Sequence, residues 1–278
     1  MKYEVSSGKA LREKHILEHY ESELNIGLAD KFVGNSIGED YSGITKAQNR
    51  QIPFEDFTEQ KFDHSQLTSV YIFTKGVLER LVSTISVILL SPLMAIIALI
   101  IRIDSQGNPI FAQERIGKNG RSFTAYKFRT MYANNDDSEY KAYLKQYILK
   151  NEPYKIDQNG KKIFKLVNDP RITRVGAILR KTNLDELPQL INIIKGEMVL
   201  IGPRPDVPFS VNMYGKWPKK RLAVTPGITG LWQVCNRKGL TFDDMVRLDI
   251  EYIGKISPLM DIKIFFLTIR TLLIGDGS

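Results

Sequence analysis

An uncharged, strongly apolar run from Leu81 to Ile101 constrains the fold of this chain more than any other feature. Its length is about that of a segment that crosses a bilayer, and it lacks the polar face of a helix on a soluble core. Lys75 and Arg80 precede the run and Arg102 follows it. Because basic residues mark the cytoplasmic side of a membrane segment, the sequence predicts a membrane helix with cytoplasmic signals at both ends.

Ser91 and Pro92 interrupt this run near its middle. Proline removes one backbone donor and strains a helix, and the Ser91 hydroxyl can bond a carbonyl that the break leaves free. Two topologies satisfy these observations: a kinked helix that spans the membrane, or a helix that enters, bends at this pair and returns to the same face. The residues alone leave both open.

The remainder of the chain mixes predicted helices and strands. The alternating segments Pro109–Arg115 and Arg121–Met131, joined by Gly117–Gly120, predict a β-hairpin. The apolar segment Leu259–Ile274 also carries charges, so we expect a second membrane-adjacent helix there. The other expectations are an amphipathic helix at 8–25, a polar cytosolic extension over 1–70, a domain over 71–278 with its membrane helix at about 77–102, and an insertion at about 133–168 with a helix around Glu139–Leu149.

Composition narrows the classes of function. The chain has 278 residues, enough for one large or two modest domains. Its net charge of +8 indicates an anionic partner, such as nucleic acid, a phosphorylated metabolite or acidic lipid. Cys235 is the only cysteine, which excludes an intramolecular disulfide and favours a reducing compartment. His15 and His19 lack the Glu of a zinc motif, so we interpret them as part of an exposed helical face.

Asp185 and Glu186 stand side by side just before a helical pattern that Gly196 is placed to end. Because Pro188 is tolerated only in the first turn, we expect both carboxylates at the helix N-terminus, where unpaired N–H groups favour anions. Neighbouring helical residues diverge by roughly 100°, so one carboxylate can face a reacting phosphorus while the other holds a metal. An ordinary acidic helix cap is the alternative.

Four arginines lie near this pair in the sequence: Arg171, Arg174, Arg180 and Arg204. Prolines on both sides of Arg204 stiffen its backbone. A guanidinium on a rigid loop suits the binding of phosphate or carboxylate, because its planar fork loses little entropy. Any one of these arginines can instead form a structural ion pair. Together with the acidic pair, the set favours a phosphate-handling site.

Five motifs follow one another along the chain: Ser91-Pro92, Tyr126–Met131, Leu179–Leu190, Val199–Pro205 and Pro226–Val234. With these motifs the sequence resembles the monotopic phosphoglycosyl transferases, bacterial sugar transferases that load a sugar-1-phosphate onto polyprenyl phosphate. The resemblance covers roughly residues 72–278. Several ordered motifs over such a span are more specific than one short pattern.

The resemblance implies transfer of a sugar-1-phosphate from a UDP-sugar to a polyprenyl (undecaprenyl) phosphate, with release of UMP. Such a step initiates the assembly of exopolysaccharide, capsule or O-antigen. The resemblance also implies that Asp185 is a nucleophile forming a covalent phosphosugar intermediate. Glu186 matches a residue that helps to bind Mg²⁺, and Arg180 and Arg204 match phosphate-binding arginines.

The resemblance further implies a topology. The membrane helix is expected to be re-entrant and broken at Ser91-Pro92, with the catalytic domain on the cytoplasmic face of the bacterial inner membrane. The expected fold class is therefore α/β: a re-entrant membrane helix, amphipathic interfacial helices and a small cytosolic α/β catalytic core. The predicted strands are too few for a doubly wound sheet.

Five further residues are candidates for the site or its support. Lys127 and Arg129 alternate on a predicted strand and so share a face, and we assign them to substrate phosphate or to support of the site. Asp169 and Arg171 favour a structural ion pair. Arg237 is a substrate-binding candidate, although the turn that carries it lacks the glycine usual in the family.

Two more segments carry expectations. Gly227 and Gly230 are expected to shape a loop near the nucleotide. Lys216–Arg221 mixes basic residues with an aromatic, which suits contact with anionic lipid headgroups. A solvated turn is the alternative for this second segment.

Two other functions compete with the transferase. A hydrolase of nucleotide sugars would use Asp185 and Glu186 as metal ligands that activate water. A non-enzymatic basic scaffold or a nucleic-acid binder would depend on the net charge alone. Aromatic-rich RNA motifs are absent from the sequence, so no nucleic-acid partner is expected. The motifs specify neither the sugar nor the oligomeric state, and a homo-oligomer stays open.

Overall fold

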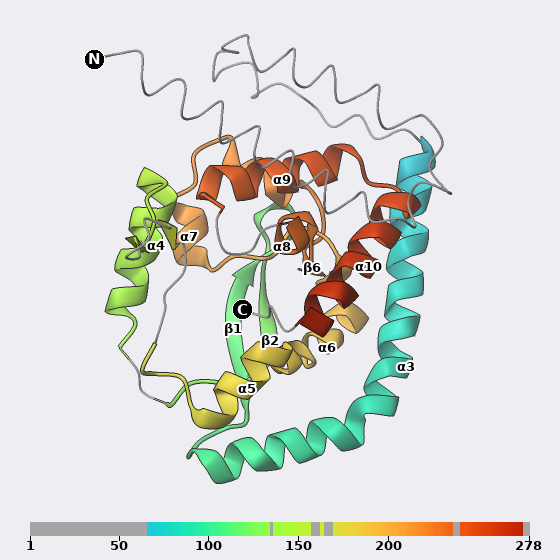
Figure 1. The fold of residues 1–278 in the computed structure, drawn as a ribbon. Coiled ribbons are helices and arrows are strands. Elements are labelled where there is room, and N and C mark those ends of the chain that lie inside the picture. The colour runs from blue at the N-terminus through green and yellow to red at the C-terminus, as the bar shows by residue number, and fades with distance from the viewer. Residues whose placement is uncertain (1–65, 134–135, 157–161, 164–168, 236–239, 275–278) are drawn as a thin grey trace, which may run out of the picture. The chain divides into compact units, whose positions relative to one another are not determined.

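The computed structural model describes residues 66–133, 136–156, 162–163, 169–235 and 240–274. All of them belong to the unit formed by residues 61–278. The predicted helix at 8–25, the His15–His19 pair and Arg237 lie outside the described residues. In the described part, helices and short strands follow one another along the chain, in agreement with the α/β class (Figure 1).

The apolar run lies within α3 (Gln66–Asp104), a helix of 39 residues. This helix is long and apolar enough to cross a membrane, and only 11% of its most apolar window is buried inside the protein. Apolar surface of this extent needs a non-aqueous environment or a partner. The described structure therefore indicates association with a membrane.

The break inside α3 has a local explanation. Pro92 lies within the helix, and Figure 1 shows α3 as two arms that meet at a bend. Pro92 cannot donate to the carbonyl of Ile88, its partner in a regular helix. The Ser91 hydroxyl donates to that carbonyl instead, at 2.8 Å. The role predicted for Ser91 is thus confirmed.

The hairpin predicted after the membrane helix is present. β1 (Ile110–Ile116) and β2 (Ser122–Phe128) pair in antiparallel fashion, with Ile110 opposite Phe128. A short 3-10 turn, η2 (Lys118–Gly120), joins them. This hairpin carries one of the charged side chains of the site described below.

Three short elements follow one another before the site loops: α5 (Arg174–Thr182), η3 (Leu184–Glu186) and α6 (Gln189–Lys195). The Thr173 side chain caps the start of α5 by accepting a backbone hydrogen bond. Gly196 ends α6 as predicted, in the left-handed conformation with φ of 77°.

The expectation that Asp185 and Glu186 lie in the first turn of a helix is wrong. Both lie in η3, a separate 3-10 turn, and Pro188 occupies the cap position of α6 after them. The cause is Asn183, whose left-handed conformation with φ of 54° ends α5 and starts the separate turn. The two carboxylates are therefore held by a tight turn and not by a regular helix.

The described residues contain three two-stranded sheets. In the parallel sheet, β5 (Val199–Ile201) pairs with β6 (Gly227–Thr229), with Val199 opposite Gly227. The remaining described elements are α4 (Ser138–Lys150), β3 (Lys155–Ile156), β4 (Lys162–Ile163), α7 (Pro208–Asn212), η4 (Pro218–Ala223), α8 (Leu231–Cys235), α9 (Phe242–Gly254) and α10 (Pro258–Ile274).

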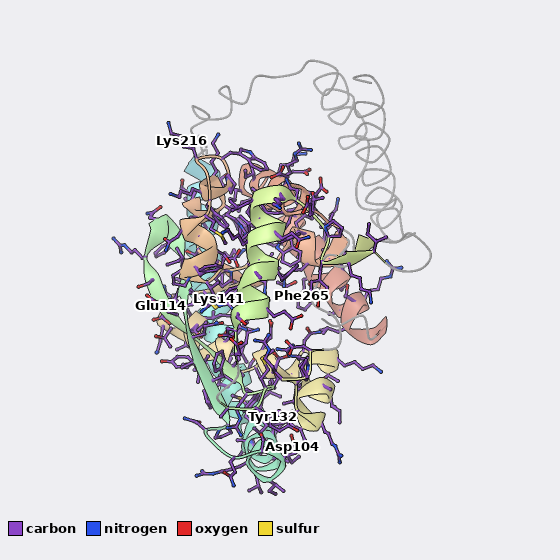
Figure 2. The ribbon with its side chains drawn as sticks, turned by 90° about the vertical axis from the view of Figure 1, so that its left-hand side faces the viewer. Asp104, Glu114, Tyr132, Lys141, Lys216 and Phe265 are labelled. Carbon is purple, nitrogen blue, oxygen red and sulfur yellow. The ribbon has the colours of Figure 1, made fainter. Side chains whose placement is uncertain are left out.

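α4 lies in the segment expected to be an insertion, and the helix predicted there is confirmed. Its Tyr143 and Leu144 are buried in a cluster with Val211 of α7 and Phe242 of α9. Figure 2 views the molecule from the side of α4, with Lys141 labelled on that helix. α4 is thus packed into the core of the described unit.

The helix predicted at 259–274 is confirmed as α10. It exposes a series of large apolar side chains: Leu259, Ile262, Phe265, Phe266, Ile269 and Leu272. Phe265 is labelled in Figure 2. The position of α10 beside a membrane remains a prediction.

Lys75 and Asp261 join α3 to α10. Lys75 Nζ lies 2.6 Å from Asp261 Oδ2, and Tyr71 and Tyr252 donate to the same carboxylate at 2.7 and 2.8 Å. Lys75 is only 9% exposed, so its charge is paired inside the protein. The roles of Lys75 and of the exposed Arg80 as cytoplasmic signals stay predictions.

Candidate active site

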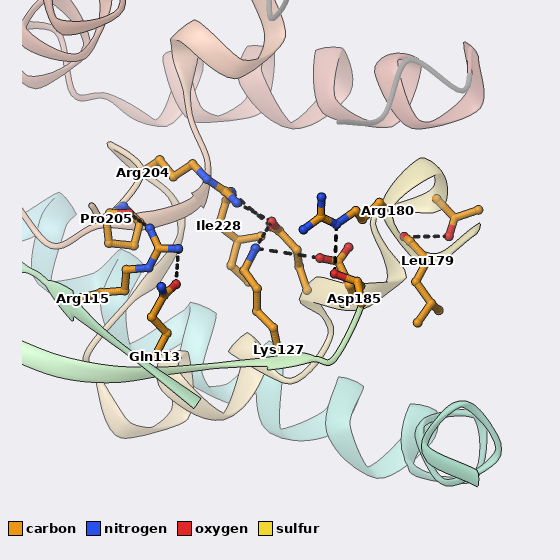
Figure 3. Close-up of polar contacts among 12 residues, drawn as sticks. Gln113, Arg115, Lys127, Leu179, Arg180, Asp185, Arg204, Pro205 and Ile228 are labelled. Carbon is orange, nitrogen blue, oxygen red and sulfur yellow. Dashed lines mark hydrogen bonds and ion pairs between the residues drawn. The ribbon is translucent and has the colours of Figure 1, made fainter. Parts of the chain in front are cut away.

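Four charged side chains from three parts of the chain meet in one place (Figure 3). Lys127 comes from β2, Asp185 and Glu186 from η3, and Arg204 from the loop after β5. Arg204 Nη2 lies 2.5 Å from Glu186 Oε1, and Lys127 Nζ lies 2.8 Å from the same oxygen. We call these four residues the site cluster.

The two carboxylates of the site cluster have different surroundings. Burial alone would raise the pKa of Glu186, but the charges of Arg204 and Lys127 outweigh it and hold that pKa well below its ordinary value. Asp185 is approached less closely, since Lys127 Nζ lies 3.9 Å from its Oδ2. Burial raises the pKa of Asp185 above its ordinary value. The charge of Glu186 is thus neutralised by close ion pairs, whereas Asp185 has only a longer contact with a cation.

Arg180 approaches the site cluster from α5. Figure 3 shows its guanidinium pointing toward Asp185, and its Nε donates to the Thr130 hydroxyl at 2.9 Å. Burial lowers the pKa of Arg180, while the charge of Asp185 acts in the opposite direction. The arrangement surrounds Asp185 with cationic side chains on more than one side.

The other predicted cations do not join the site cluster. Arg129 directly follows β2, and its backbone N–H still donates to the Pro109 carbonyl at 2.8 Å. Its guanidinium donates to the Ser105 and Gln106 carbonyls, at 2.6 and 2.7 Å, just after α3. Arg129 therefore binds backbone carbonyls at the end of α3 and not a carboxylate of the site cluster.

Arg171 and Arg174 differ from the two site arginines. Arg171 Nη2 lies 2.7 Å from Asp169 Oδ2, which is the ion pair favoured from the sequence. Arg174 is exposed at the start of α5. Of the four arginines near the acidic pair in sequence, the structure brings Arg180 and Arg204 to it.

Sequence reasoning missed Arg115, on β1. Its Nη1 donates to the Pro205 carbonyl at 3.1 Å, and its Nη2 donates to Gln113 at 2.6 Å. Figure 3 shows Arg115 beside the loop that carries Arg204. Alternation along β1 was the available signal, because it places Gln113 and Arg115 on one face.

Sequence reasoning also misplaced Arg221, which was expected at lipid headgroups. Arg221 is 2% exposed, and its Nη2 lies 2.5 Å from Asp249 Oδ2 on α9. Its Nη1 lies 2.9 Å from Asp206 Oδ2. Its Nη2 also donates to the backbone carbonyl of Arg204, at 3.2 Å. We call Arg221, Asp249, Asp206 and Tyr214, which donates to Asp206, the support network.

Gly227 allows β6 to approach the site loop closely. A Cβ added at Gly227 would lie 2.2 Å from the Gly202 nitrogen, so only glycine fits there. The next residue, Ile228, accepts a hydrogen bond from Arg204 Nη1 at 3.4 Å. The loop expected near the nucleotide thus contacts the side chain of Arg204. The role expected for Gly230 in nucleotide binding stays a prediction.

The donor set of the site cluster fits Mg²⁺. Asp185 and Glu186 offer carboxylate oxygens, which this hard cation prefers, and it commonly takes one or two carboxylates together with substrate phosphates. No group of three or more His, Cys, Asp or Glu residues assembles within the described ranges. A cation at this site would therefore need oxygens from substrate or water as well.

Comparisons with known proteins agree with the motifs. Residues 70–275 match the family described as bacterial sugar transferase. Galactosyl transferase CpsE of Streptococcus agalactiae is 42% identical over 184 residues, which are 66% of this chain and 38% of CpsE. Exopolysaccharide production protein ExoY of Sinorhizobium fredii is 37% identical over 205 residues, which are 74% of this chain and 88% of ExoY. The chain therefore belongs to the bacterial sugar transferase family.

A third relative is the undecaprenyl-phosphate galactose phosphotransferase of Salmonella typhimurium. It is 40% identical over 207 residues, which are 74% of this chain and 42% of that protein. The chain thus spans about two fifths of the length of CpsE and of this phosphotransferase, as the 38% and 42% coverages show.

Proposed function

We propose that this chain is a phosphoglycosyl transferase that moves a sugar-1-phosphate from a UDP-sugar to undecaprenyl phosphate or a similar polyprenyl phosphate. The reaction would initiate the assembly of a bacterial surface polysaccharide. Membership of the sugar transferase family supports the reaction class, and the printed name of the Salmonella relative supports the lipid acceptor. The observation that carries the proposal is the difference between Asp185 and Glu186 in the site cluster.

The proposed reaction has two steps at one phosphorus. An Asp185 carboxylate oxygen attacks the phosphorus that carries the sugar, the bond from that phosphorus to the bridging oxygen breaks, and UMP leaves with the electron pair. An oxygen of the lipid phosphate then attacks the same phosphorus, and the Asp185 carboxylate leaves. Each step exchanges one phosphorus–oxygen bond for another. A covalent intermediate lets a soluble donor and a membrane-bound acceptor react in turn.

Asp185 suits the role of nucleophile better than Glu186 does. A carboxylate held by two close cations has little free charge for attack, and Glu186 is held in that way. Burial makes Asp185 more basic than an ordinary aspartate, and basicity favours nucleophilic attack while the group remains ionised.

The cations have a separate role. Charge on the transferring phosphoryl group must be stabilised, and fixed cations do this without reorganisation. Arg204 and Arg180 are placed to do so, and Glu186 holds Arg204 and Lys127 beside Asp185. In the proposed mechanism Mg²⁺, held by Glu186 together with substrate oxygens, would neutralise further phosphate charge.

We also propose that α3 is re-entrant, with both of its ends on the cytoplasmic side of the inner membrane. Two observations support this topology. The helix α3, which contains Pro92, is bent (Figure 1), and the exposed residues Arg80 and Arg102 flank the two ends of its apolar run. Single cysteines at the exposed positions Thr74 and Gln106, in a Cys235→Ser background, test it. Both should resist a membrane-impermeant reagent until the cells are permeabilised. Labelling of one end alone in intact cells would show a spanning helix.

A hydrolase is the second candidate, and it makes a different demand on the site. Both carboxylates would have to bind a metal that activates water. This hydrolase would give both carboxylates the same role. The structure gives them different surroundings, with close cations at Glu186 and a more distant one at Asp185, and this difference favours the transferase, in which their roles differ. A basic scaffold would need neither carboxylate.

Release of UMP separates these candidates. The purified chain is incubated with a panel of UDP-sugars, with and without undecaprenyl phosphate, and UMP is measured. A transferase releases UMP continuously only when the lipid is present, and the panel identifies the sugar. Equal release without lipid would indicate the hydrolase. No release with any sugar, in an otherwise folded protein, would contradict both enzymes.

A further inference from the structure

A pocket of about 260 Å³ lies beside the first arm of α3. Its walls come from α3, η2, the C-terminal cap of α6, β5, the segment after η4, and α9. Phe73, Gly76, Val77 and Arg80 contribute the wall on α3, and Lys118 contributes η2. None of the four residues of the site cluster lines it, so this pocket is separate from the candidate active site.

The lining of the pocket is cationic. Its charged members are Lys75, Arg80 and Lys118, and no Asp or Glu occurs among the described residues that line it. Lys75 is neutralised by its ion pair with Asp261. Arg80 and Lys118 are exposed, which leaves two solvent-accessible positive charges at the pocket. The charge of the pocket therefore complements an anion.

The position of Arg80 relates the pocket to the membrane. Arg80 is the last charged residue before the uncharged run Leu81–Ile101. A basic residue at this point of a membrane helix lies at the level of the lipid headgroups. Phe73 and Val77, on the same wall, are exposed and apolar. Leu81 follows Val77 by four residues, so it lies on the same stripe of the helix, and it is also exposed and apolar. Apolar surface therefore continues from the pocket into the uncharged run.

We propose that this pocket binds one anionic phospholipid. The headgroup phosphate would contact Arg80 and Lys118, and an acyl chain would follow Val77 and Leu81 into the membrane segment. Two basic residues without a lining carboxylate favour an anionic over a zwitterionic headgroup. The inference depends on membrane association of α3 and not on the transferase reaction.

Native mass spectrometry of the full chain in detergent tests the charge requirement. Wild-type protein should retain phosphatidylglycerol in preference to phosphatidylcholine. The double variant Arg80→Gln/Lys118→Gln should weaken phosphatidylglycerol binding by on the order of tenfold. The control Arg102→Gln/Lys181→Gln removes the same charge from exposed residues outside the pocket, one of them at the other end of the apolar run. We expect the control to bind like wild type.

Gly76→Phe tests the pocket without changing charge. A Cβ at Gly76 would meet nothing within 4 Å, and any residue with a Cβ other than proline favours a helix over glycine. The phenyl ring should therefore occlude the pocket without lowering Tm, and bound phosphatidylglycerol should fall. Gly254→Phe, at another open helical glycine, is the control.

Three results would overturn the proposal. One is equal retention of the two phospholipids by wild-type protein. Another is unchanged phosphatidylglycerol binding in both the double variant and Gly76→Phe. The third is displacement of phosphatidylglycerol from wild-type protein by equimolar undecaprenyl phosphate, because that would assign the pocket to the acceptor.

Discussion

The site cluster and the support network both pair arginine with carboxylate, but they differ in exposure. The Arg204 side chain is 27% exposed beside Glu186, whereas that of Arg221 is 2% exposed beside Asp249. The two are connected, since Arg221 donates to the backbone carbonyl of Arg204. Arg221 therefore fixes the backbone of the loop after β5, and the partly exposed Arg204 keeps part of its guanidinium open to a ligand.

The carboxylates of the two groups differ in the same way, which indicates a reactive role for one and a structural role for the other. In the support network the carboxylate of Asp249 is 1% exposed, and its cation lies at 2.5 Å. In the site cluster Asp185 has its nearest cation at 3.9 Å. A carboxylate without a close ion pair in a partly open site can react with a substrate, whereas a closely paired carboxylate without solvent access stabilises the fold.

The largest effect is expected from Asp185→Asn. A neutral amide is a far poorer nucleophile, so transfer should fall by on the order of 10³-fold or more. Because burial raises the pKa of Asp185, its ionised form disfavours folding, and the variant should melt at the same or a higher temperature near pH 7. UMP release and thermal denaturation measure the two effects. Full activity, with deamidation excluded by mass spectrometry, would refute the assignment.

Arg221→Met should have the next largest effect, on stability. Removing one partner of a buried ion pair costs about 3–5 kcal/mol, which corresponds to a fall in Tm of about 10 °C for a domain of this size. Arg221→Met/Asp249→Asn leaves no unpaired charge at Asp249 and should recover part of the loss. If the single and double variants melt alike, the pair does not couple as described.

Arg204→Lys should lower the transfer rate by about 10-fold to 100-fold, because an ammonium keeps the charge but cannot form bidentate hydrogen bonds to a phosphate. Its Tm should change little, since the side chain is partly exposed. Arg174→Lys is the matched control, at an exposed position away from the site cluster. Equal rates for both variants would reduce Arg204 to a general electrostatic role.

Glu186→Gln should lower stability less than Arg221→Met does, by about 1–2 kcal/mol at pH 7. The pKa of Glu186 is lowered in the folded state, so its ion pairs stabilise the fold above the ordinary glutamate pKa of about 4.3 and lose that effect as pH falls toward the lowered value. The Tm difference from wild type should therefore shrink below about pH 4. A difference independent of pH would contradict the ion-pair account.

Local patterns predicted much of the described fold. The β1–β2 hairpin followed from alternation around two glycines, and Gly196 ended α6 because glycine adopts a left-handed cap readily. The bond from Ser91 to the Ile88 carbonyl followed from the chemistry of proline. Each of these features depends on residues close together in the sequence.

Features that depend on distant residues were missed. Arg221 resembled a surface cation because its partner Asp249 lies on another helix. The ion pair of Lys75 was not predicted because Asp261 lies near the other end of the domain. One local feature was also missed: Asp185 and Glu186 were placed in the first turn of a helix, whereas the left-handed Asn183 starts a separate 3-10 turn that holds them. Motifs selected the candidate site residues, but the different surroundings of Asp185 and Glu186 became visible only in the structure.

The most direct test of the central claim is to trap the covalent intermediate. The purified chain is incubated with the UDP-sugar that gives the most UMP release, without any lipid acceptor, and its intact mass is measured. We predict a mass gain of one sugar phosphate, located on Asp185 by peptide mapping and absent from Asp185→Asn, and we predict that undecaprenyl phosphate removes it. An adduct on Glu186, or lipid-dependent turnover without any adduct on the protein, would contradict the account.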